Sequence, residues 1–538
     1  MTIDPDTVVR ALLAEYGSPD ACAAELLCDR HSVANTAFTI VESDLSASDL
    51  TYGELRERST RFAAALADLG IEPGDRVATL MGKSADLLTV LLGIWRRGAV
   101  HVPLFTAFAP AAIAFRLDAS GAKVVVADAD QRPKLDPGED VPADPAWRVI
   151  TAGAADTLSL DALLGEYAAD DPRGAAIAVG ADGVMVQLYT SGTTGTPKGV
   201  PVPVRALAGL VGYQHFALDV REDDVYWNVA DPGWAYGLYY AILSPLASGM
   251  RSLLLHSGFS APLTRQVLEK FGVTNLAAAP TVYRALRADD ENAWEGVRLR
   301  RASSAGEPLT PDIPAWSERA LGVAVRDHYG QTEHGMLIAN AWHDELRTEV
   351  RPGSMGKPLP GTRMAVIDES SDRVLDPGEQ GRVVVDTHNS PAVWFTGYVD
   401  APEKTASRYT ADGRWYLTGD AGTVDADGFF YFSSRDDDVI IMAGYRIGPF
   451  DVESVLVLHD AVLEAAVVGM PDALRGEVIE AFVVLANGFE GGPELEAELQ
   501  QLVKTKFAAH AYPRTVHFVD SLPKTPSGKV QRFLLRQR

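Results

Sequence analysis

A short segment dense in glycine and hydroxyl side chains is the first part of this chain with a pattern suited to chemistry. Residues 189–200 read Tyr-Thr-Ser-Gly-Thr-Thr-Gly-Thr-Pro-Lys-Gly-Val. Glycines let the backbone turn so that amide groups converge on an anion, and the hydroxyls and the lysine add further donors. The apolar residues 184–189 predict a buried strand leading into this loop. A phosphate-binding loop is therefore predicted. Its spacing is not that of a Walker A loop, and a plain surface loop is the alternative on composition alone.

The whole segment resembles the phosphate-loop signature of the adenylate-forming superfamily, which includes acyl-CoA synthetases, peptide-synthetase adenylation domains and luciferases. Further strings follow in the order of that superfamily's motifs, at residues 304–308, 327–333, 416–420, 444–449 and 523–532. The resemblance spans residues 50–538, and its C-terminal part is most similar to medium-chain acyl-CoA synthetases and their bacterial relatives. It implies a ligase that converts a medium-chain or aryl carboxylic acid to its CoA thioester through an acyl-adenylate, releasing AMP and pyrophosphate.

The resemblance also implies roles for individual residues. Lys529, Thr332 and Glu333 are expected to serve catalysis, and Glu333 with Thr194 to hold Mg²⁺, because a hard cation that bridges phosphate oxygens needs a carboxylate. Asp420 is expected to bind both ribose hydroxyls, a bidentate task that suits a carboxylate. The residues expected to contact ATP or AMP are Thr190, Ser191, Gly192, Thr193, Thr194, Gly195, Lys198, Gly306, Glu307, Pro308, Asp327, His328, Tyr329, Gly330, Gln331, Thr332, Asp420, Phe432 and Arg435.

The C-terminal region is predicted to be a separate mobile domain. We expect an N-terminal adenylate-forming domain at 1–434 and a C-terminal domain at 435–538, with the hinge near Asp437. The resemblance implies that this domain supplies Lys529 to one half-reaction and a coenzyme A tunnel to the other. The residues expected to contact CoA are Gly444, Tyr445, Arg446 and Arg475.

The acyl pocket is predicted from an uncharged aromatic stretch and one small residue. We expect it to be lined by Trp234, Tyr236, Tyr240 and Gly330, with plain core packing as the alternative for the aromatic residues. Acetate-specific relatives have a tryptophan at the place of Gly330, so the pocket is expected to be deeper than acetate needs. Residues 232–249 contain no acid to pair with an ammonium, which disfavours amino acids as substrates.

Some positions depart from the pattern of the superfamily. Val202 and Pro203 replace a hydroxyl residue after the phosphate loop, and Ser434 replaces a glycine before Arg435. Ala511 stands where the relatives usually have a lysine. The resemblance therefore does not determine the structure just after the phosphate loop, the structure at the hinge, or whether one CoA contact is present.

Strands and helices alternate along the chain and must position these motifs. Apolar residues at helical spacing follow residue 50, a strand is expected at 76–81, a helix at 85–97 and a second strand at 122–127. Further strands are expected at 253–255 and 276–279, and 129–182 reads largely as surface connection. Such alternation predicts an α/β fold with a large domain of layered sheets. Asp-Pro-Gly turns among short apolar runs at 363–385 predict a small β subdomain, and the C-terminal domain is expected to be α+β.

Length and charge limit the function classes. The 538 residues exceed one ordinary core, so at least two domains are expected. A net charge of -25 disfavours nucleic acid and anionic membranes as partners.

Cys22 and Cys28 match neither a metal pair nor a redox motif, and the N-terminus has no signal-peptide pattern. No apolar run is long enough for a membrane span, so a cytoplasmic protein is expected. Its predicted partners are ATP, Mg²⁺, coenzyme A and a small carboxylic acid, and a homodimer stays open.

Two alternatives remain at this point. The chain could catalyse one half-reaction, either adenylation or thioester formation from an adenylate made elsewhere. It could instead be a silent adenylate-binding protein, although Glu333, Asp420 and Lys529 are all retained. Measuring AMP release with and without CoA separates these possibilities.

Overall fold

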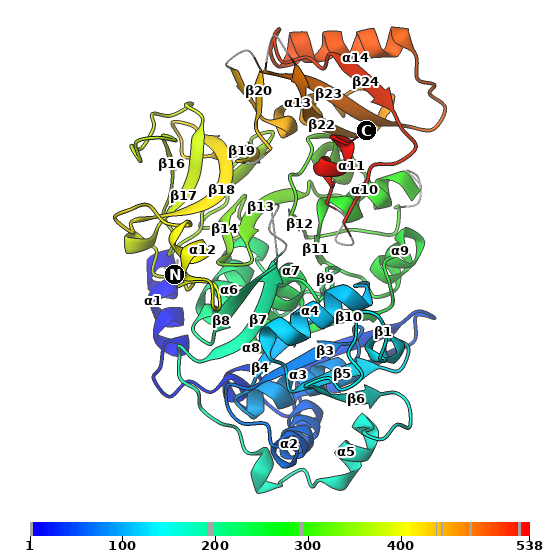
Figure 1. Ribbon diagram of the computed structural model, residues 1–538, viewed down its shortest axis with the longest axis vertical. Coiled ribbons are helices and arrows are strands. Elements are labelled where there is room, and N and C mark those ends of the chain that lie inside the picture. The colour runs from blue at the N-terminus through cyan, green and yellow to red at the C-terminus, as the bar shows by residue number, and fades with distance from the viewer. Residues whose placement is uncertain are drawn as a thin grey trace.

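The computed structural model describes residues 4–190, 197–289, 294–436, 438–442, 445–472, 476–525 and 529–537. Within these ranges the chain forms two sheets in a large N-terminal domain and one in a small C-terminal domain (Figure 1). Ser191, Gly192, Thr193, Thr194, Gly195, Asp437, Gly444 and Arg475 lie outside the described residues, and Tyr445 and Arg446 are described by their backbone alone.

The first sheet of the large domain carries the start of the phosphate loop. Its strand order is β6-β5-β3-β4-β7-β8, parallel except where β8 runs against β7. The strands are β3 (Arg76–Leu80), β4 (Val100–Pro103), β5 (Val124–Asp128), β6 (Arg148–Ala152), β7 (Val184–Thr190) and β8 (Lys198–Pro203). The strands expected at 76–81, 122–127 and 184–189 are thus confirmed.

Both faces of this sheet are covered, because successive side chains of a strand point to opposite sides. Val77 of β3 packs into the central core with helices α2 (Tyr52–Asp68) and α3 (Ala85–Arg96). Ala78 and Leu80 pack on the other face with α4 (Pro110–Ser120). Local capping helps to start α2, where Thr51 and Glu54 form a reciprocal capping box.

The second sheet is longer and carries most of the predicted nucleotide residues. Its order is β16-β17-β18-β19-β15-β14-β13-β12-β11-β9-β10-β1-β2 in the described part of the chain. The strands are β1 (Thr36–Glu42), β2 (Ala47–Thr51), β9 (Tyr226–Asn228), β10 (Ser252–His256), β11 (Asn275–Ala278), β12 (Arg301–Ala305), β13 (Arg326–Gln331), β14 (Gly335–Ala339), β15 (Ser354–Pro358), β16 (Met364–Ile367), β17 (Gly381–Asp386), β18 (Trp415–Val424) and β19 (Phe430–Arg435). The β subdomain predicted at 363–385 corresponds to β16 and β17, which β18 and β19 extend, and β15 joins it to β14 in the rest of the sheet.

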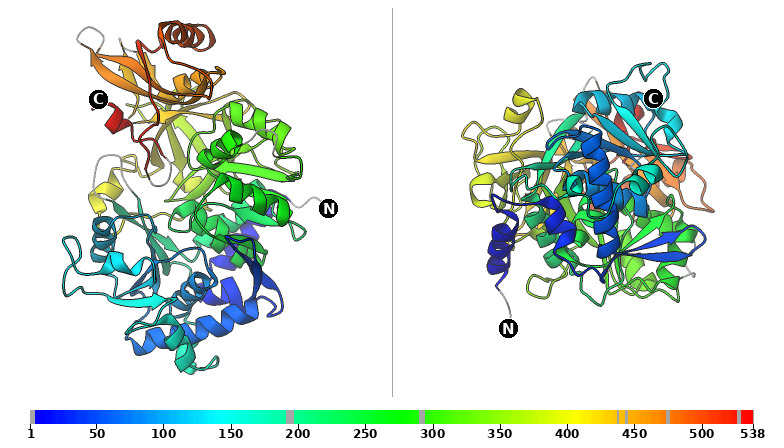
Figure 2. Two further views of the ribbon diagram at one scale, coloured as in Figure 1. Left: turned by 90° about the vertical axis from the view of Figure 1, so that its right-hand side faces the viewer. Right: turned by 90° about the horizontal axis from the view of Figure 1, so that it is seen from below.

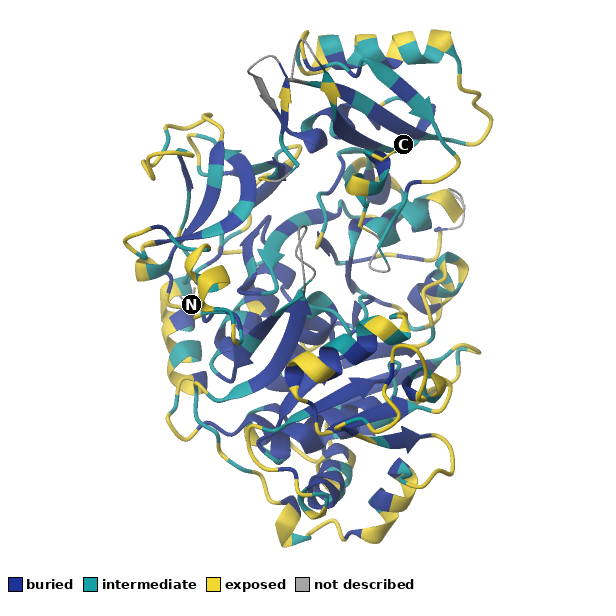
Figure 3. Cartoon of the chain, in the orientation of Figure 1, coloured by how far each residue is buried: buried dark blue, intermediate teal, exposed yellow. Residues whose placement is uncertain are grey.

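Helices complete the layers of the large domain. Trp227, Leu253 and Leu276 pack on one face of the second sheet, in the cluster that includes helices α9–α11. The other face shares its core with the first sheet through Tyr226 and Leu254. The remaining helices are α1 (Pro5–Tyr16), α5 (Leu160–Glu166), α6 (Ala206–Tyr213), α7 (Ala235–Gly237), α8 (Ser244–Ser248), α9 (Ala261–Lys270), α10 (Pro280–Asp289), α11 (Asp312–Ala320) and α12 (Pro402–Ala406). Figure 2 shows the helices around the sheets, and Figure 3 shows the strands as mostly buried.

The small domain follows β19 and lies beside α10 and α11 (Figure 1). Its strands are β20 (Ile440–Met442), β21 (Tyr445–Ile447), β22 (Val462–Asp472), β23 (Gly476–Leu485) and β24 (Thr515–Phe518). Its helices are α13 (Pro449–Leu456), α14 (Pro493–Lys506) and α15 (Arg532–Leu535). Arg435 still pairs with Asp420 in the large sheet, whereas β20 belongs to the sheet of the small domain. The predicted domain boundary at 434/435 and the hinge near Asp437 stay predictions.

One region holds more structure than the sequence indicates. Residues 129–182, expected to be largely surface connection, contain the edge strand β6 and helix α5. Along β6 the residues change from exposed at Arg148 to buried at Ile150 instead of alternating. The strand therefore lacks the alternation of apolar and polar residues by which a half-buried strand is predicted from sequence. Cys22 and Cys28 are buried free thiols.

Candidate active site

The phosphate loop connects two paired strands. Thr190 ends β7, Lys198 begins β8, and the two residues are register partners across the antiparallel pair. Residues 191–196 of the loop between them lie outside the described residues, so its predicted phosphate contacts stay predictions. The structure places Thr190 and Lys198 at its base.

Lys198 lies close to the predicted metal ligand through a tyrosine that the motifs do not include. Glu333 is buried, and the hydroxyl of Tyr398 donates a 2.8 Å hydrogen bond to its Oε1. The ammonium of Lys198 lies 4.9 Å from the centroid of the same tyrosine ring. Burial lowers the pKa of Lys198, the nearby Arg408 lowers it further, and Glu333 opposes the shift. Lys198, Tyr398 and Glu333 thus form one charged cluster.

Asp420 is held rigidly in β18. Its Oδ2 accepts hydrogen bonds from the hydroxyl of Tyr329 at 2.5 Å and from Nε2 of Gln331 at 2.9 Å. Its Oδ1 lies 3.3 Å from Nε of Arg435, the register partner of Asp420 on β19. The carboxylate is buried, and charge-assisted contacts of this kind orient it firmly. The predicted residues Tyr329, Gln331, Asp420 and Arg435 therefore meet at one point.

Glycine allows two cations to lie close to the backbone just before Asp420. Gly419 has φ +76°, and a Cβ at that residue would lie 2.7 Å from Nη1 of Arg408 and 3.7 Å from Nη2 of Arg435. Arg408 also influences the pKa of Tyr398 and Lys198. Lys198, Arg408 and Arg435 therefore surround the two buried carboxylates. This arrangement is suited to a polyphosphate, whose negative charge needs local cations in a chain of net charge -25.

The predicted adenine loop follows β12. Gly306 has φ +100°, a conformation that favours glycine. The carboxylate of Glu307 accepts hydrogen bonds of 2.9 Å from Oγ1 of Thr281 and from Nη2 of Arg284, both on α10. The loop is therefore tied to the start of a helix. Pro308 comes next and is partly buried.

Asp327 and His328 lie on β13, beside this loop in the parallel sheet. Burial raises the pKa of Asp327, and its Oδ1 has no hydrogen-bond partner among the described residues. An amino group of adenine placed there would satisfy this acceptor, so the residues fit a nucleotide. Burial lowers the pKa of His328 to about 3, which makes the ring neutral, and its Nδ1 lies 2.8 Å from the hydroxyl of Tyr213.

The predicted aromatic residues of the acyl pocket divide into two groups. Trp234 packs against Phe105 and Phe108, at ring-centroid distances of 5.4 and 5.5 Å. Tyr236 and Tyr240 lie 5.4 Å apart, and both contact Tyr213. The reason is local: Trp234 has extended backbone angles just before α7, whereas Tyr236 and Tyr240 lie on the helical segment that follows.

Gly330 is required by the hairpin of β13 and β14. A Cβ at this residue would lie 2.1 Å from the carbonyl oxygen of Gly335 and 2.5 Å from Cα of Met336. A larger residue at 330 therefore needs a shift of the hairpin backbone, so a bulky substitution there would disturb the hairpin as well as any pocket beside it. The contribution of Gly330 to the acyl pocket stays a prediction.

Thr332 and Phe432 are less directly connected to the cluster. The carbonyl of Thr332 accepts a 2.9 Å hydrogen bond from the hydroxyl of Tyr239, which fixes the turn before Glu333. Phe432 packs against Phe450 of the small domain, 5.9 Å between centroids, so it lies at the contact of the two domains.

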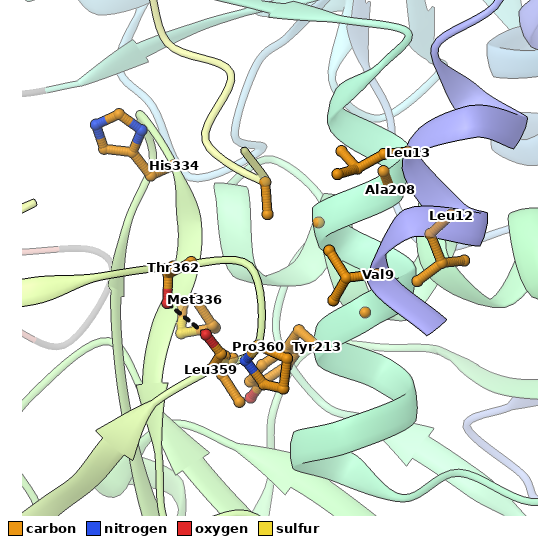
Figure 4. A pocket seen from close by; sticks show the side chains of 13 residues that line it. Val9, Leu12, Leu13, Ala208, Tyr213, His334, Met336, Leu359, Pro360 and Thr362 are labelled. Carbon is orange, nitrogen blue, oxygen red and sulfur yellow. Dashed lines mark hydrogen bonds between the residues drawn. The ribbon is translucent and has the colours of Figure 1, made fainter. Parts of the chain in front are cut away.

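A separate small pocket lies between α1 and α6 (Figure 4). Val9, Leu12 and Leu13 of α1 face Tyr213 and Met336 across it. Among the described residues that line it, none belongs to the predicted acyl set of Trp234, Tyr236, Tyr240 and Gly330. This small pocket is therefore distinct from the predicted acyl pocket, although Tyr213 contacts both.

Lys529 lies in the small domain, beside an antiparallel bridge near the C-terminus. Lys524 and Val530 form a bridge, and the amide of Thr525 donates to the carbonyl of Lys529 at 2.8 Å. The side chain of Lys529 is exposed. Its predicted role, like those of the CoA residues, stays a prediction.

Comparison with known proteins agrees with this geometry. The family model of AMP-binding enzymes matches residues 28–398, and that of the AMP-binding enzyme C-terminal domain matches residues 451–529. The chain belongs to the AMP-binding enzyme family. The resemblance to the adenylate-forming superfamily is thereby confirmed.

Relatives match this family member over nearly its whole length. It is 38% identical to the acetyl-coenzyme A synthetase of Bacillus subtilis (strain 168), over 90% of this chain and 84% of that protein. It is 34% identical to the mitochondrial acyl-coenzyme A synthetase ACSM3 of Rattus norvegicus, over 94% of this chain and 87% of that protein. The crystal structure of an acyl-CoA synthetase from Brucella canis matches with a TM-score of 0.77 and 44% identity, covering 100% and 97% of the two chains.

The structure also identifies residues that the motifs miss. Tyr398, Arg408 and Tyr239 each contact or influence a motif residue. Single tyrosines and arginines carry no spacing signal, so sequence patterns alone cannot find them. Arg284, on α10, is a fourth such residue.

Proposed function

We propose that this enzyme activates a carboxylic acid larger than acetate, of the medium-chain or aryl class, and joins it to coenzyme A. The overall activity is that of an AMP-forming acid–thiol ligase, as in the acyl-CoA synthetases that it resembles. The observation that supports ATP-dependent activation of the acid is the cluster of two buried carboxylates, Glu333 and Asp420, with three cations near them. That cluster can hold a nucleotide by its ribose and its phosphates together.

In the first half-reaction, an oxygen of the substrate carboxylate attacks the α-phosphorus of ATP and pyrophosphate leaves. A carboxylate is a poor electrophile, and the adenylate supplies a good leaving group. The protein contributes position and charge. Asp420 would hold the ribose, Lys198 and Arg408 would lie along the departing phosphates, and Lys529 would bridge the two reacting anions.

In the second half-reaction, the thiol of coenzyme A attacks the acyl carbon and AMP leaves. We propose that the small domain turns about Asp437 between the halves. The segment that contains Gly444, Tyr445 and Arg446 would then border the thiol's path, and Arg475 would contact CoA. The short connection between β19 and β20 is where such a rotation can occur.

Mg²⁺ belongs to this proposal as a partner of ATP. When bound, it neutralises phosphate charge, and Glu333 and Thr194 are the residues that would hold it. The described residues contain no group of three or more His, Cys, Asp or Glu side chains suited to a metal. A site with one carboxylate completed by substrate phosphates fits that finding, because Mg²⁺ is usually bound in this way.

The class of acid is inferred from polarity. Tyr236 and Tyr240 bring aromatic surface near the motif turn, and residues 232–249 contain no acidic side chain. An apolar or aromatic acyl group is therefore favoured over an amino acid, whose ammonium would be left unpaired.

Location and assembly complete the proposal. No helix among the described residues is long and apolar enough to cross a membrane. Cys22 and Cys28 are free and buried, which fits a reducing compartment, and we propose the cytoplasm. Light scattering of the purified enzyme distinguishes a monomer from a homodimer.

A panel of carboxylic acids tests the proposal. Pyrophosphate release would be followed with acetate, butyrate, hexanoate, octanoate, benzoate and an amino acid, with CoA present. We expect the highest kcat/KM for a medium-chain or aryl acid. Acetate as the best substrate would contradict the proposed acid class. Pyrophosphate release without thioester would instead favour an enzyme of one half-reaction, and no turnover with any acid would favour a silent binding protein.

A further inference from the structure

A row of alternating charges connects the adenine loop to the small domain. Glu307 of the loop accepts a 2.9 Å hydrogen bond from Nη2 of Arg284 on α10. Nε of the same guanidinium lies 3.6 Å from Oε1 of Glu464, on β22 of the small domain. Glu464 in turn accepts hydrogen bonds of 2.7 and 2.8 Å from the ammonium of Lys524. The order of charges is therefore negative, positive, negative, positive across the domain boundary.

These four side chains are largely shielded from water. Arg284 is 17% exposed and Glu307 is 12% exposed. Glu464 and Lys524 are 19% and 27% exposed. Solvent screens such contacts less than it screens a surface ion pair. Their geometry can therefore influence how the two domains are oriented.

The far end of the row supports the turn that bears Lys529. Lys524 is bridged to Val530, and Thr525 and Lys529 exchange hydrogen bonds within the same turn. Fixing Lys524 on Glu464 therefore fixes the base of that turn. Arg284 connects this base to Glu307, which belongs to the loop predicted to contact adenine.

We propose that Arg284 is a positioning residue that holds the adenine loop and the small domain together in the orientation for adenylation. The inference rests on the two-step reaction proposed above. Without the guanidinium, the carboxylates of Glu307 and Glu464 face each other with no cation between them. Their repulsion favours rotation of the small domain, which carries the Lys529 turn away from the nucleotide.

Two substitutions separate the loop contact from the domain contact. Glu464→Gln removes the charge on the small domain but leaves the pair of Arg284 and Glu307 intact. We expect it to slow adenylation by about five- to twentyfold, with the KM for ATP within about twofold of wild type. Arg284→Ala breaks both contacts and should slow adenylation by about ten- to a hundredfold and also raise the KM for ATP. Arg284→Lys keeps the charge and should recover part of the loss.

Arg287 provides a matched control. It lies one turn further along α10 and pairs with Asp312 inside the large domain, at similar exposures of 18% and 14%. Arg287→Ala should lower thermal stability without slowing one half-reaction more than the other. An effect that follows from general damage to α10 would appear in this variant as well.

The experiment measures each half-reaction by single-turnover kinetics in the full-length enzyme. Thioester formation from a supplied acyl-adenylate should stay within about twofold of wild type in both Glu464→Gln and Arg284→Ala. The double variant should slow adenylation by less than the product of the two single effects, because Glu464 acts partly through the same guanidinium and partly through Lys524. Three results would overturn the inference. They are a normal adenylation rate in Glu464→Gln, an equal loss of rate in both half-reactions, and an adenylation rate in the double variant that is lowered by the full product of the two single effects. A wild-type enzyme that releases no pyrophosphate would instead refute the proposed function itself.

Discussion

The hydroxyl of Tyr398 is the simplest group with which to test the arrangement of the proposed metal site. It donates a 2.8 Å hydrogen bond to the buried carboxylate of Glu333. Tyr398→Phe removes this donor and keeps the ring that packs 5.0 Å from Phe395 and lies under the ammonium of Lys198. The change therefore removes the hydrogen bond to Glu333 and the contact of the same hydroxyl with Arg408, and it keeps the packing of the ring.

The size of the expected effect follows from the nature of that bond. A hydrogen bond to a charged group contributes about 1.5–3 kcal/mol, equivalent to a factor of about 10–150. Partners that orient a metal-ligating carboxylate have effects of about 10–100-fold on metal affinity or activity. We therefore expect the Mg²⁺ concentration for half-maximal pyrophosphate release to rise by about 10–100-fold in Tyr398→Phe.

The assay is a Mg²⁺ titration of pyrophosphate release at saturating acid and fixed ATP. Tyr409→Phe is the matched control, because that hydroxyl donates to the carbonyl of Phe395 at 3.3 Å and does not bond Glu333. We expect the control to change the Mg²⁺ dependence by less than about threefold. An unchanged Mg²⁺ dependence in Tyr398→Phe, or the same loss in both variants, would refute the assignment of Glu333.

Three further predictions concern the other charged groups. Lys529→Ala should slow adenylation by about a hundred- to a thousandfold and leave thioester formation from a supplied acyl-adenylate near wild type, as single-turnover kinetics of each half would show; equal loss in both would count against its role. Asp420→Asn should raise the KM for ATP by about ten- to a hundredfold, because the ribose and Arg435 both lose a charged partner; unchanged ATP kinetics would argue that Asp420 does not bind the ribose. Burial lowers the pKa of Lys198, so its positive charge is lost as pH rises, at a lower pH than for a free lysine. The KM for ATP should therefore increase on the alkaline side, and Lys198→Arg should move that increase to higher pH; a KM independent of pH would contradict the placement of Lys198 along the phosphates.

The sequence predicts the parts of this fold that have strong local patterns. The strands at Arg76–Leu80 and Val124–Asp128 and helix α3 match their expected positions, because apolar periodicity and flanking glycines mark them clearly. The motif at 327–333 meets Asp420 as the resemblance implies, through hydrogen bonds of Tyr329 and Gln331, although three strands separate β13 from β18 in the sheet. The edge strand β6 is missed because its half-exposed residues show no regular alternation.

The candidate site is predicted less completely than the fold. Tyr398 contacts Glu333 although the two residues are far apart in the sequence. Residues that act through one such contact belong to no motif with fixed spacing, so the sequence does not reveal them. The sequence analysis assigns Trp234 and Tyr240 to one pocket because they are close in sequence. In the structure, Trp234 has an extended backbone just before α7, and its side chain therefore lies beside Phe105. From the sequence, Gly330 is interpreted as a small residue that leaves room for the substrate. The structure shows that a glycine is also needed at this position because the backbone of Gly335 lies so close to it.

The most direct test of the two-step reaction is a single-turnover experiment in which coenzyme A is withheld and then added. Enzyme in excess over ATP is mixed with Mg²⁺ and the best acid of the panel, and samples are quenched before and after the addition of CoA. The account predicts one pyrophosphate and one enzyme-bound acyl-adenylate per ATP before CoA, followed by equal amounts of AMP and acyl-CoA after it. Pyrophosphate that forms only once CoA is present, or ADP and phosphate as products, would contradict it.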